Sequence, residues 1–265
     1  MTSPNNRTPR VALVIGSGGV KCAAALGVWK VLQREGIGID LVVGCSGGSL
    51  YASLIALGYE PDNVEQMTQQ FWTDDLMAGY TANLRAVMAG ELKFDERSGM
   101  VSDTPLLERL RAVYAEREFA EARIPLFVVA TDLKNGEKVV LSAGKLLDAI
   151  RASLAIPLVF PPWEVNGRLL IDGAASDPLP IDVAIKEGAQ LILALGFELP
   201  YRAHMRSMNL VQSQLNAIYI NNLLRASFAF HNLAHHAEVI PIWPDFTKPV
   251  ANFDTQQFAY IIAQG

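Results

Sequence analysis

The chain has 265 residues, of which 51% are hydrophobic and only 18% are charged, and its formal net charge is −5. A chain of this length and composition can bury a substantial core. Its scattered basic residues and negative charge exclude an electrostatic nucleic-acid binder, so we expect no nucleic-acid partner. The two cysteines, Cys22 and Cys45, are too few for a disulfide scaffold and indicate free thiols in a reducing compartment.

No segment is typical of a membrane span or of a secretory signal. The longest apolar runs, at about 11–15 and 190–197, are shorter than the roughly 20 residues that cross a bilayer. The N-terminal residues MTSPNNRTPR lack the charged start and apolar run of a signal peptide, so we expect a cytoplasmic protein. A large core explains most of the mean hydropathy of +0.21, and a lipid-facing surface, peripheral to a membrane, is the alternative explanation.

The first 58 residues predict a disordered arm over 1–9 and then two strand–turn–helix units. The predicted strands cover 11–15 and 40–44, and the predicted helices cover 21–36 and 48–58. Each helix ends at a glycine, Gly36 or Gly58, which is a common helix stop. Two such units in about 50 residues are typical of a parallel α/β sheet.

The rest of the chain continues this alternation after a less regular helical part over about 60–122. That part contains a loop over 93–105, after which Ser102 or Asp103 is expected to cap a short helix. The elements predicted next are a hairpin of strands over 124–133 and 138–144, a helix over 145–155, a strand over 168–174, a helix over 181–188, a strand over 190–198, one or two helices over 203–237, a strand over 237–243 and a helix over 255–265. No repeat or linker divides the chain, so residues 10–265 are expected to form one domain.

The second strand–helix turn carries the clearest chemical signal. Gly44-Cys45-Ser46-Gly47-Gly48 fits the pattern G-x-S-x-G between a strand and a helix. The glycines let the backbone pack closely around a sharp turn that presents Ser46 at a helix N-terminus, where unpaired N–H groups suit a developing oxyanion. A plain glycine-rich turn would match the same short pattern. Cys45 is the better nucleophile by chemistry, but its position predicts that it points into the packing.

The first turn, Gly16-Ser17-Gly18-Gly19, belongs to the neighbouring unit and should fall on the same carboxyl edge of the sheet. Backbone N–H groups there can reach a substrate oxygen. A dinucleotide fingerprint would need glycine where Lys21 stands, and a P-loop would need G-K-[ST]. A nucleotide-binding α/β domain is therefore the weaker alternative.

A nucleophilic serine also needs a base, and the histidines at 204, 231, 235 and 236 all lie late in the chain. One of them could complete a triad in the α/β-hydrolase order, but several strands precede the serine in that fold and only one does here. His231 and His235 are four residues apart, yet no H-E-x-x-H pattern accompanies them, so a solvated helix face is favoured over a metal site.

Two aspartates are the other candidates for the base. Asp172 ends a predicted strand directly before Gly173, and partial burial would raise its pKa toward that of a useful base. Asp177 lies five residues later, and the following Pro178 favours a role in a turn. On the residues alone, both aspartates remain open.

Three blocks taken together resemble the patatin-like phospholipases, especially bacterial members and the catalytic domain of neuropathy target esterase. They are SGGVKCAAALGV (17–28), GCSGG (44–48) and DGA (172–174), and two further stretches, 130–144 and 150–162, agree with them. The resemblance runs from about residue 10 to the end. It implies a three-layer α/β/α fold around a mainly parallel sheet.

The resemblance also implies a function, that of a serine acyl hydrolase of the esterase, phospholipase A or lysophospholipase type. It implies a Ser–Asp dyad without a catalytic histidine, with Ser46 as nucleophile and Asp172 as base, and no cofactor or metal. The oxyanion N–H groups would come from Gly18, Gly19 and Val20. The supporting motif positions are Gly44, Gly48, Lys21 and Gly173. The substrates would be lipid or other acyl esters, met in transient contact with a membrane surface.

The chain departs from the family pattern at both turns. The usual G-G-G-x-R-G loop has serine at Ser17, lysine at Lys21 and cysteine at Cys22, and the serine turn has Cys45 and Gly47 where threonine and alanine are more frequent. A poorly active, specialised or non-catalytic member of the same fold is therefore a second hypothesis. The segment 60–105, with Phe71, Trp72, Leu76, Met77 and Met88, is expected to form either an acyl-chain wall and cover or ordinary core.

Overall fold

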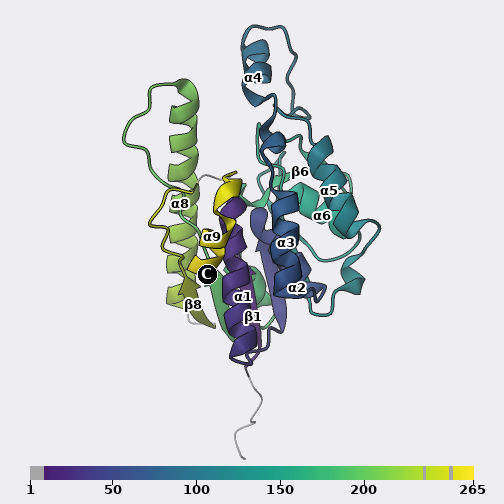
Figure 1. Ribbon diagram of the computed structural model, residues 1–265, viewed down its shortest axis with the longest axis vertical. Coiled ribbons are helices and arrows are strands. Elements are labelled where there is room, and N and C mark those ends of the chain that lie inside the picture. Colours follow the sequence, from purple (N-terminus) through teal and green to yellow (C-terminus); the bar gives the residue numbers. More distant parts are fainter. Residues whose placement is uncertain (1–8, 235–236, 251–252) are drawn as a thin grey trace, which may run out of the picture.

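A computed structural model describes residues 9–234, 237–250 and 253–265. Its centre is an eight-stranded sheet in the order β5-β6-β3-β2-β1-β7-β8, with β4 also paired to β3 (Figure 1). The strands are β1 Val11–Ile15, β2 Leu41–Cys45, β3 Leu126–Asp132, β4 Lys138–Leu141, β5 Trp163–Val165, β6 Arg168–Asp172, β7 Leu191–Leu195 and β8 Glu238–Ile242. The five neighbouring strands β3-β2-β1-β7-β8 pair in parallel, whereas β4 and β6 run antiparallel to β3.

Helices cover both faces of this sheet. One face packs against α1 Ala24–Arg34, α2 Gly47–Ala56, α3 Pro61–Phe71, α5 Thr104–Tyr114, α6 Leu146–Ser153 and α9 Phe258–Gln264, and the other against α7 Ile181–Lys186 and α8 Met208–Ala234. Alternate residues of β1 show the division, since Leu13 belongs to the first core and Val14 to the second. The expected three-layer α/β/α fold with a mainly parallel sheet is thus confirmed.

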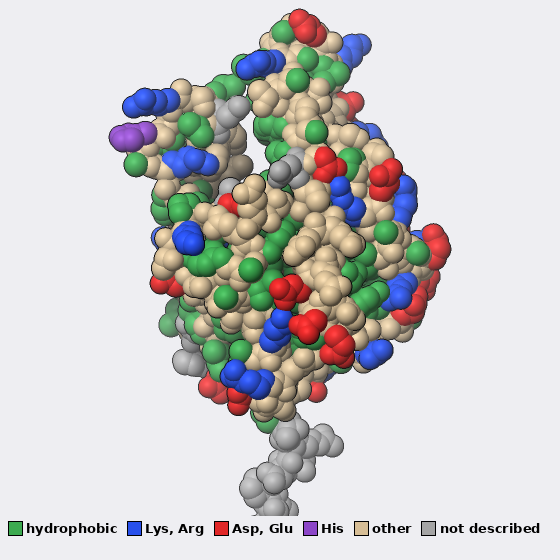
Figure 2. Space-filling model, in the orientation of Figure 1, with side chains coloured by type: hydrophobic (Ala, Val, Ile, Leu, Met, Phe, Trp, Pro, Cys, Tyr) green, Lys and Arg blue, Asp and Glu red, His purple; other side chains and the backbone are tan. Residues whose placement is uncertain are grey.

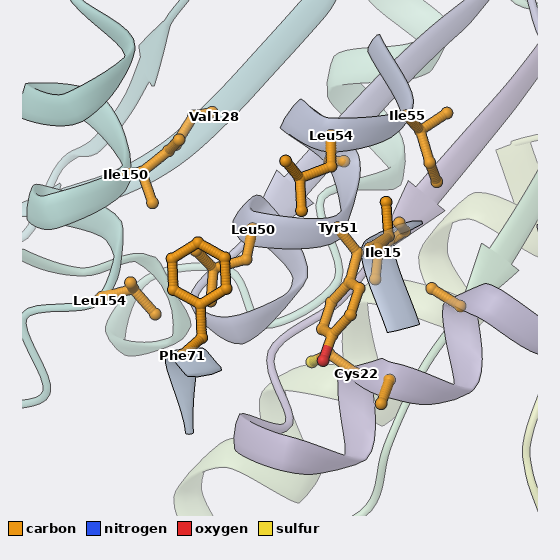
Figure 3. Close-up of a cluster of buried hydrophobic side chains, with 14 of the residues drawn as sticks. Ile15, Cys22, Leu50, Tyr51, Leu54, Ile55, Phe71, Val128, Ile150 and Leu154 are labelled. Atoms are coloured by element: carbon orange, nitrogen blue, oxygen red, sulfur yellow. The ribbon is translucent and has the colours of Figure 1, made fainter. Parts of the chain in front are cut away.

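The larger core fills the space between the sheet and the first set of helices. Figure 3 shows Leu50 of α2, Phe71 of α3 and Leu154 grouped within it. Trp72 and Leu76 belong to the same core, so core packing is the outcome for these members of the 60–105 segment. Met88 ends α4 (Tyr80–Met88) and is 65% exposed. Helix α4 forms a projection at the top of Figure 1.

The strands other than β5, which the sequence analysis did not predict, and most helices lie close to their predicted positions, including the β3–β4 hairpin. The helix expected over 21–36 instead opens as a 3-10 turn, Gly19–Ala23, because Lys21 N–H donates to the carbonyl of Gly18, three residues back. Asp103 stands at the N-cap of α5, but its carboxylate accepts from the Arg151 guanidinium at 2.8 Å and makes no cap hydrogen bond.

The prediction for residues 1–8 falls outside the described residues, and the single domain over 10–265 stays a prediction. Within the described ranges, no helix has the length and apolar character to cross a bilayer.

Candidate active site

Ser46 stands at a sharp turn between β2 and α2. Its φ of 53° and ψ of −128° are uncommon for a residue other than glycine and mark a strained turn. The Ser46 N–H donates to Ser153 Oγ at 2.8 Å, and its carbonyl accepts from the backbone and the hydroxyl of Ser49 at 2.9 Å and 2.7 Å. Hydrogen bonds on both sides of the turn therefore hold the Ser46 side chain in one direction.

Glycines make this turn compact. A Cβ on Gly44 would lie 2.6 Å from Ser49 Cα, and one on Gly48 would lie 2.6 Å from the carbonyl oxygen of Gly16. The start of α2 therefore packs directly against the end of β1, which pairs in parallel with β2. As a result, the two glycine turns predicted to share an edge of the sheet lie side by side.

Asp172 meets Ser46 at the bottom of a pocket. Ser46 Oγ donates to Asp172 Oδ2 at 2.5 Å, and Asp172 Oδ1 accepts from the backbone N–H of Ala174 at 2.8 Å. Both side chains are buried, with Ser46 5% and Asp172 4% exposed. Burial raises the pKa of Asp172 to about 6, although its bonds from Ser46 and Ala174 act to lower it.

Asp172 reaches Ser46 from an antiparallel strand. Its strand, β6, runs antiparallel to β3 and pairs only with the last residues of β3, so Asp172 lies opposite Ala130. Cys45, the last residue of β2, pairs with Val129 on the other side of β3. The end of β6 and the end of β2 therefore lie next to the same part of β3. Gly173 lets the chain pass here, because a Cβ on it would lie 2.9 Å from Cys45 Sγ.

The glycine loop after β1 faces the same space. Within the described residues, the backbone N–H groups of Gly18, Gly19 and Val20 donate to no acceptor. Gly18 and Gly19 line the pocket beside Ser46, whereas the Val20 side chain is fully buried in the larger core. Lys21 does not face this pocket, because its Nζ donates to the carbonyl of Glu198 at 3.1 Å.

The pocket over Ser46 has a volume of about 310 Å³ and mostly apolar walls. Ile156 and Leu199 form part of these walls, and α8 supplies Asn216, Tyr219, Ile220 and Leu223. The sequence did not predict that α8 would line this pocket, because α8 begins more than 150 residues after Ser46.

Comparison with known proteins places this arrangement in a family. A sequence model of the patatin-like phospholipases matches residues 13–185. The chain belongs to the patatin-like phospholipase family.

Its relatives are longer than the part they share with it. It is 29% identical over 227 residues to an uncharacterized NTE family protein of Mycobacterium tuberculosis, which covers 86% of this chain and 59% of that protein. It is 29% identical over 187 residues to the human patatin-like phospholipase domain-containing protein 6, covering 70% of this chain and 13% of that protein. The chain therefore spans about three fifths of the mycobacterial relative.

Solved structures of low similarity also match. VipD from Legionella pneumophila is 14% identical with a TM-score of 0.47, over 97% of this chain and 65% of that one. The type III effector protein ExoU is 15% identical with a TM-score of 0.45, over 97% of this chain and 51% of that one.

In this patatin-like chain, Asp177 is engaged elsewhere. Its carboxylate accepts from Lys138 Nζ at 2.8 Å and from the backbone N–H of Leu179 at 3.2 Å, an ion pair combined with a turn. Cys45 is fully buried in the smaller core, where burial raises the pKa of its thiol well above the usual value. Of the described residues that line the pocket, none is a histidine.

Two departures from the patatin-like pattern lie against each other. A Cβ on Gly47 would lie 3.2 Å from Cys22 Sγ and 2.6 Å from the carbonyl oxygen of Gly19. Glycine at 47 therefore lets the serine turn approach the backbone of Gly19, with the thiol of Cys22 next to it.

Ser153 is a part of the site that the sequence analysis missed. Its hydroxyl accepts from Ser46 N–H and donates to the carbonyl of Val129 at 2.7 Å, so it ties the serine turn to β3. It lies in the predicted helix over 145–155, and only the three-dimensional contact distinguishes it from other small helical residues.

Proposed function

We propose that this chain is a serine acyl hydrolase that cleaves lipid acyl esters through a Ser46–Asp172 dyad. The observation that carries the proposal is the 2.5 Å hydrogen bond from Ser46 Oγ to Asp172 Oδ2 beneath a pocket with apolar walls. An aspartate with a pKa of about 6 is mostly ionised at neutral pH and can accept a proton from the hydroxyl it contacts.

In the first half of the reaction, Ser46 Oγ forms a bond to the ester carbonyl carbon and its proton passes to Asp172 Oδ2. The carbonyl oxygen becomes an oxyanion, which the free N–H groups of Gly18 and Gly19 can stabilise from the adjacent loop. The bond to the leaving alcohol then breaks. The alcohol takes the proton from Asp172, and the acyl group remains on Ser46.

In the second half, Asp172 accepts a proton from a water molecule as that water attacks the acyl carbon. The carbon–Oγ bond breaks, Ser46 Oγ regains the proton from Asp172, and the carboxylic acid leaves. The chain returns to its starting protonation state, so these two side chains and the loop N–H groups are sufficient for each step.

The shape of α8 supports a lipid ester as the substrate. Met208, Val211, Leu215, Tyr219 and Leu223 are spaced three or four residues apart, which puts them on one face of the helix, and all are exposed. Tyr219 and Leu223 line the pocket, so the exposed stripe continues from its wall toward the start of α8. In Figure 2, this part of α8 and the α4 segment form two projections separated by a notch. The stripe would contact a lipid surface transiently while the acyl chain enters.

Hydrolysis of a chain-length series of p-nitrophenyl esters and of a lysophospholipid tests the proposal. Ser46→Ala should abolish turnover, and Asp172→Asn should reduce it at least about a thousandfold. Ser142→Ala, a change of an exposed serine in a loop, is the matched control and should leave turnover unchanged. No turnover of any ester by the wild-type protein would favour the non-catalytic alternative, and turnover retained by Ser46→Ala would contradict the dyad.

A further inference from the structure

A second and larger pocket, of about 590 Å³, lies beside the Ser46 pocket. Its walls are the segments 196–201 and 243–250, which follow β7 and β8, together with Lys21 from the turn after β1. Leu199 lines both pockets. In the strand order β2-β1-β7, the strand that follows β1 in the sequence, β2, pairs with one edge of β1, and β7 pairs with the other edge. Such a position is a topological switch point, and ligands of open α/β sheets bind at switch points.

Lys21 is the unusual group in this pocket. It is only 3% exposed, and its ammonium makes one hydrogen bond, to the carbonyl of Glu198. Among the described residues, no carboxylate lies within ion-pair distance of it. Lysine has three donors, so two remain available. A buried charge without a counter-ion is costly, and burial accordingly lowers the pKa of Lys21.

The other charged groups at this pocket limit what it can hold. The Glu198 carboxylate is paired with Arg225 at 2.8 Å, and Lys248 Nζ lies 5.3 Å from the centre of the Tyr260 ring. Lys248 and Asp245 both line the pocket and carry opposite charges, so among the described residues Lys21 is the one positive charge there that no lining carboxylate offsets. A ligand with a single negative charge therefore fits better than a phosphate dianion.

The remaining walls are largely aromatic. Phe197 and Phe246 stack with their ring centres 6.4 Å apart, and Trp243, 41% exposed, packs against Gly196 and the edge of Phe228. Prolines and Val250 complete the lining. These surfaces gain free energy by covering an apolar chain rather than a polar one.

We propose that this second pocket binds an amphiphile with one carboxylate, such as a fatty acid, whose carboxylate pairs with Lys21 Nζ and whose chain covers Trp243 and Phe246. The contact is non-covalent, and it does not depend on the Ser46–Asp172 dyad. A fatty acid is also the product expected from ester hydrolysis, but the pocket would take it from any source.

The test measures binding of decanoate to the full chain carrying Ser46→Ala, which removes turnover. By calorimetry, decanoate should bind at least about tenfold more tightly than uncharged decanol, since the charged contact is absent in the alcohol. Lys21→Met should remove that difference. Lys21→Gln, which keeps a donor for the Glu198 carbonyl, should remove it too and serves if the methionine variant unfolds. Lys134→Met, at an exposed position outside the pocket, should keep the difference.

The position of the ligand is tested by quenching of tryptophan fluorescence with 2-bromodecanoate. Quenching should occur with Trp243 present and fall at least severalfold in Trp243→Phe. Quenching that persists in Trp243→Phe would place the ligand elsewhere and overturn the proposal. It is also overturned if decanoate and decanol bind equally, if both Lys21 variants keep the preference, if decyl phosphate binds most tightly, or if decanoate does not bind.

Discussion

Burial of an ionised Asp172 should cost the folded protein stability in a pH-dependent way. The folded-state pKa is about 6 against an ordinary value of 3.8, so the folded chain binds the proton more tightly than the unfolded chain does. The stabilisation from this group is fully present below about pH 3.8 and is lost as the pH rises through about 6. The shift of about two units corresponds to about 3 kcal/mol when the group is fully ionised.

Asp172→Asn removes this titration and keeps the side-chain shape. The free energy of unfolding of the variant, relative to that of the wild type, should therefore be higher at pH 8 than at pH 4, by about 2 to 3 kcal/mol, so the variant is relatively more stable at pH 8. Urea unfolding followed by circular dichroism measures the free energy of unfolding of the variant and of the wild type at each pH. The difference between variant and wild type is then compared between pH 4 and pH 8, and contributions of other titrating groups cancel in this comparison.

Glu96→Gln, at an exposed position that does not line the pocket, is the control and should show no comparable change between the two pH values. If Asp172→Asn shifts stability equally at pH 4 and pH 8, to within about 0.5 kcal/mol, the carboxylate does not titrate near pH 6, and its assignment as a base tuned by burial is wrong.

The remaining predictions concern catalysis. For a neutral ester, kcat/KM should fall about tenfold per pH unit below about pH 6 and level off above it, because Asp172 must be ionised; a flat profile from pH 5 to 8 would contradict this. Ser153→Ala should lower kcat more than it raises KM and destabilise the fold by about 1–3 kcal/mol, since it removes the hydrogen bonds of this hydroxyl with Ser46 N–H and the Val129 carbonyl. Ser153→Thr should recover part of both, and an unchanged kcat would exclude a positioning role. Val211→Asp should slow hydrolysis of vesicle-borne lipid severalfold but not of a soluble ester, so an equal loss on both would argue against contact of α8 with the lipid surface.

The local parts of the site were predictable from the sequence. G-x-S-x-G between a strand and a helix located Ser46, and the glycine turn one strand earlier located Gly18 and Gly19, because both signals depend on backbone rules that act over a few residues. The neighbouring positions of the two turns followed from the parallel pairing expected of consecutive strand–helix units.

Contacts between distant segments were less predictable. The antiparallel course of β6, which sets Asp172 opposite Ala130, depends on how β6 pairs with β3, and the strand's own residues do not encode that direction. Ser153 is one of several small residues in α6, and only packing places its hydroxyl at Ser46. Lys21 matched the family's positive position, yet its side chain lies in the second pocket, because the 3-10 turn after Gly18 directs it there.

Reaction with a fluorophosphonate, followed by mapping of the modified peptide, tests the central claim most directly. The probe phosphonylates an activated serine hydroxyl, and in the proposed dyad Asp172, which accepts a hydrogen bond from Ser46 Oγ at 2.5 Å, would activate Ser46. We predict a single adduct on Ser46 of the wild-type protein, no adduct in Ser46→Ala, and a rate at least about a hundredfold lower in Asp172→Asn. An unmodified wild-type protein, or an adduct on another serine that persists in Ser46→Ala, would contradict the account.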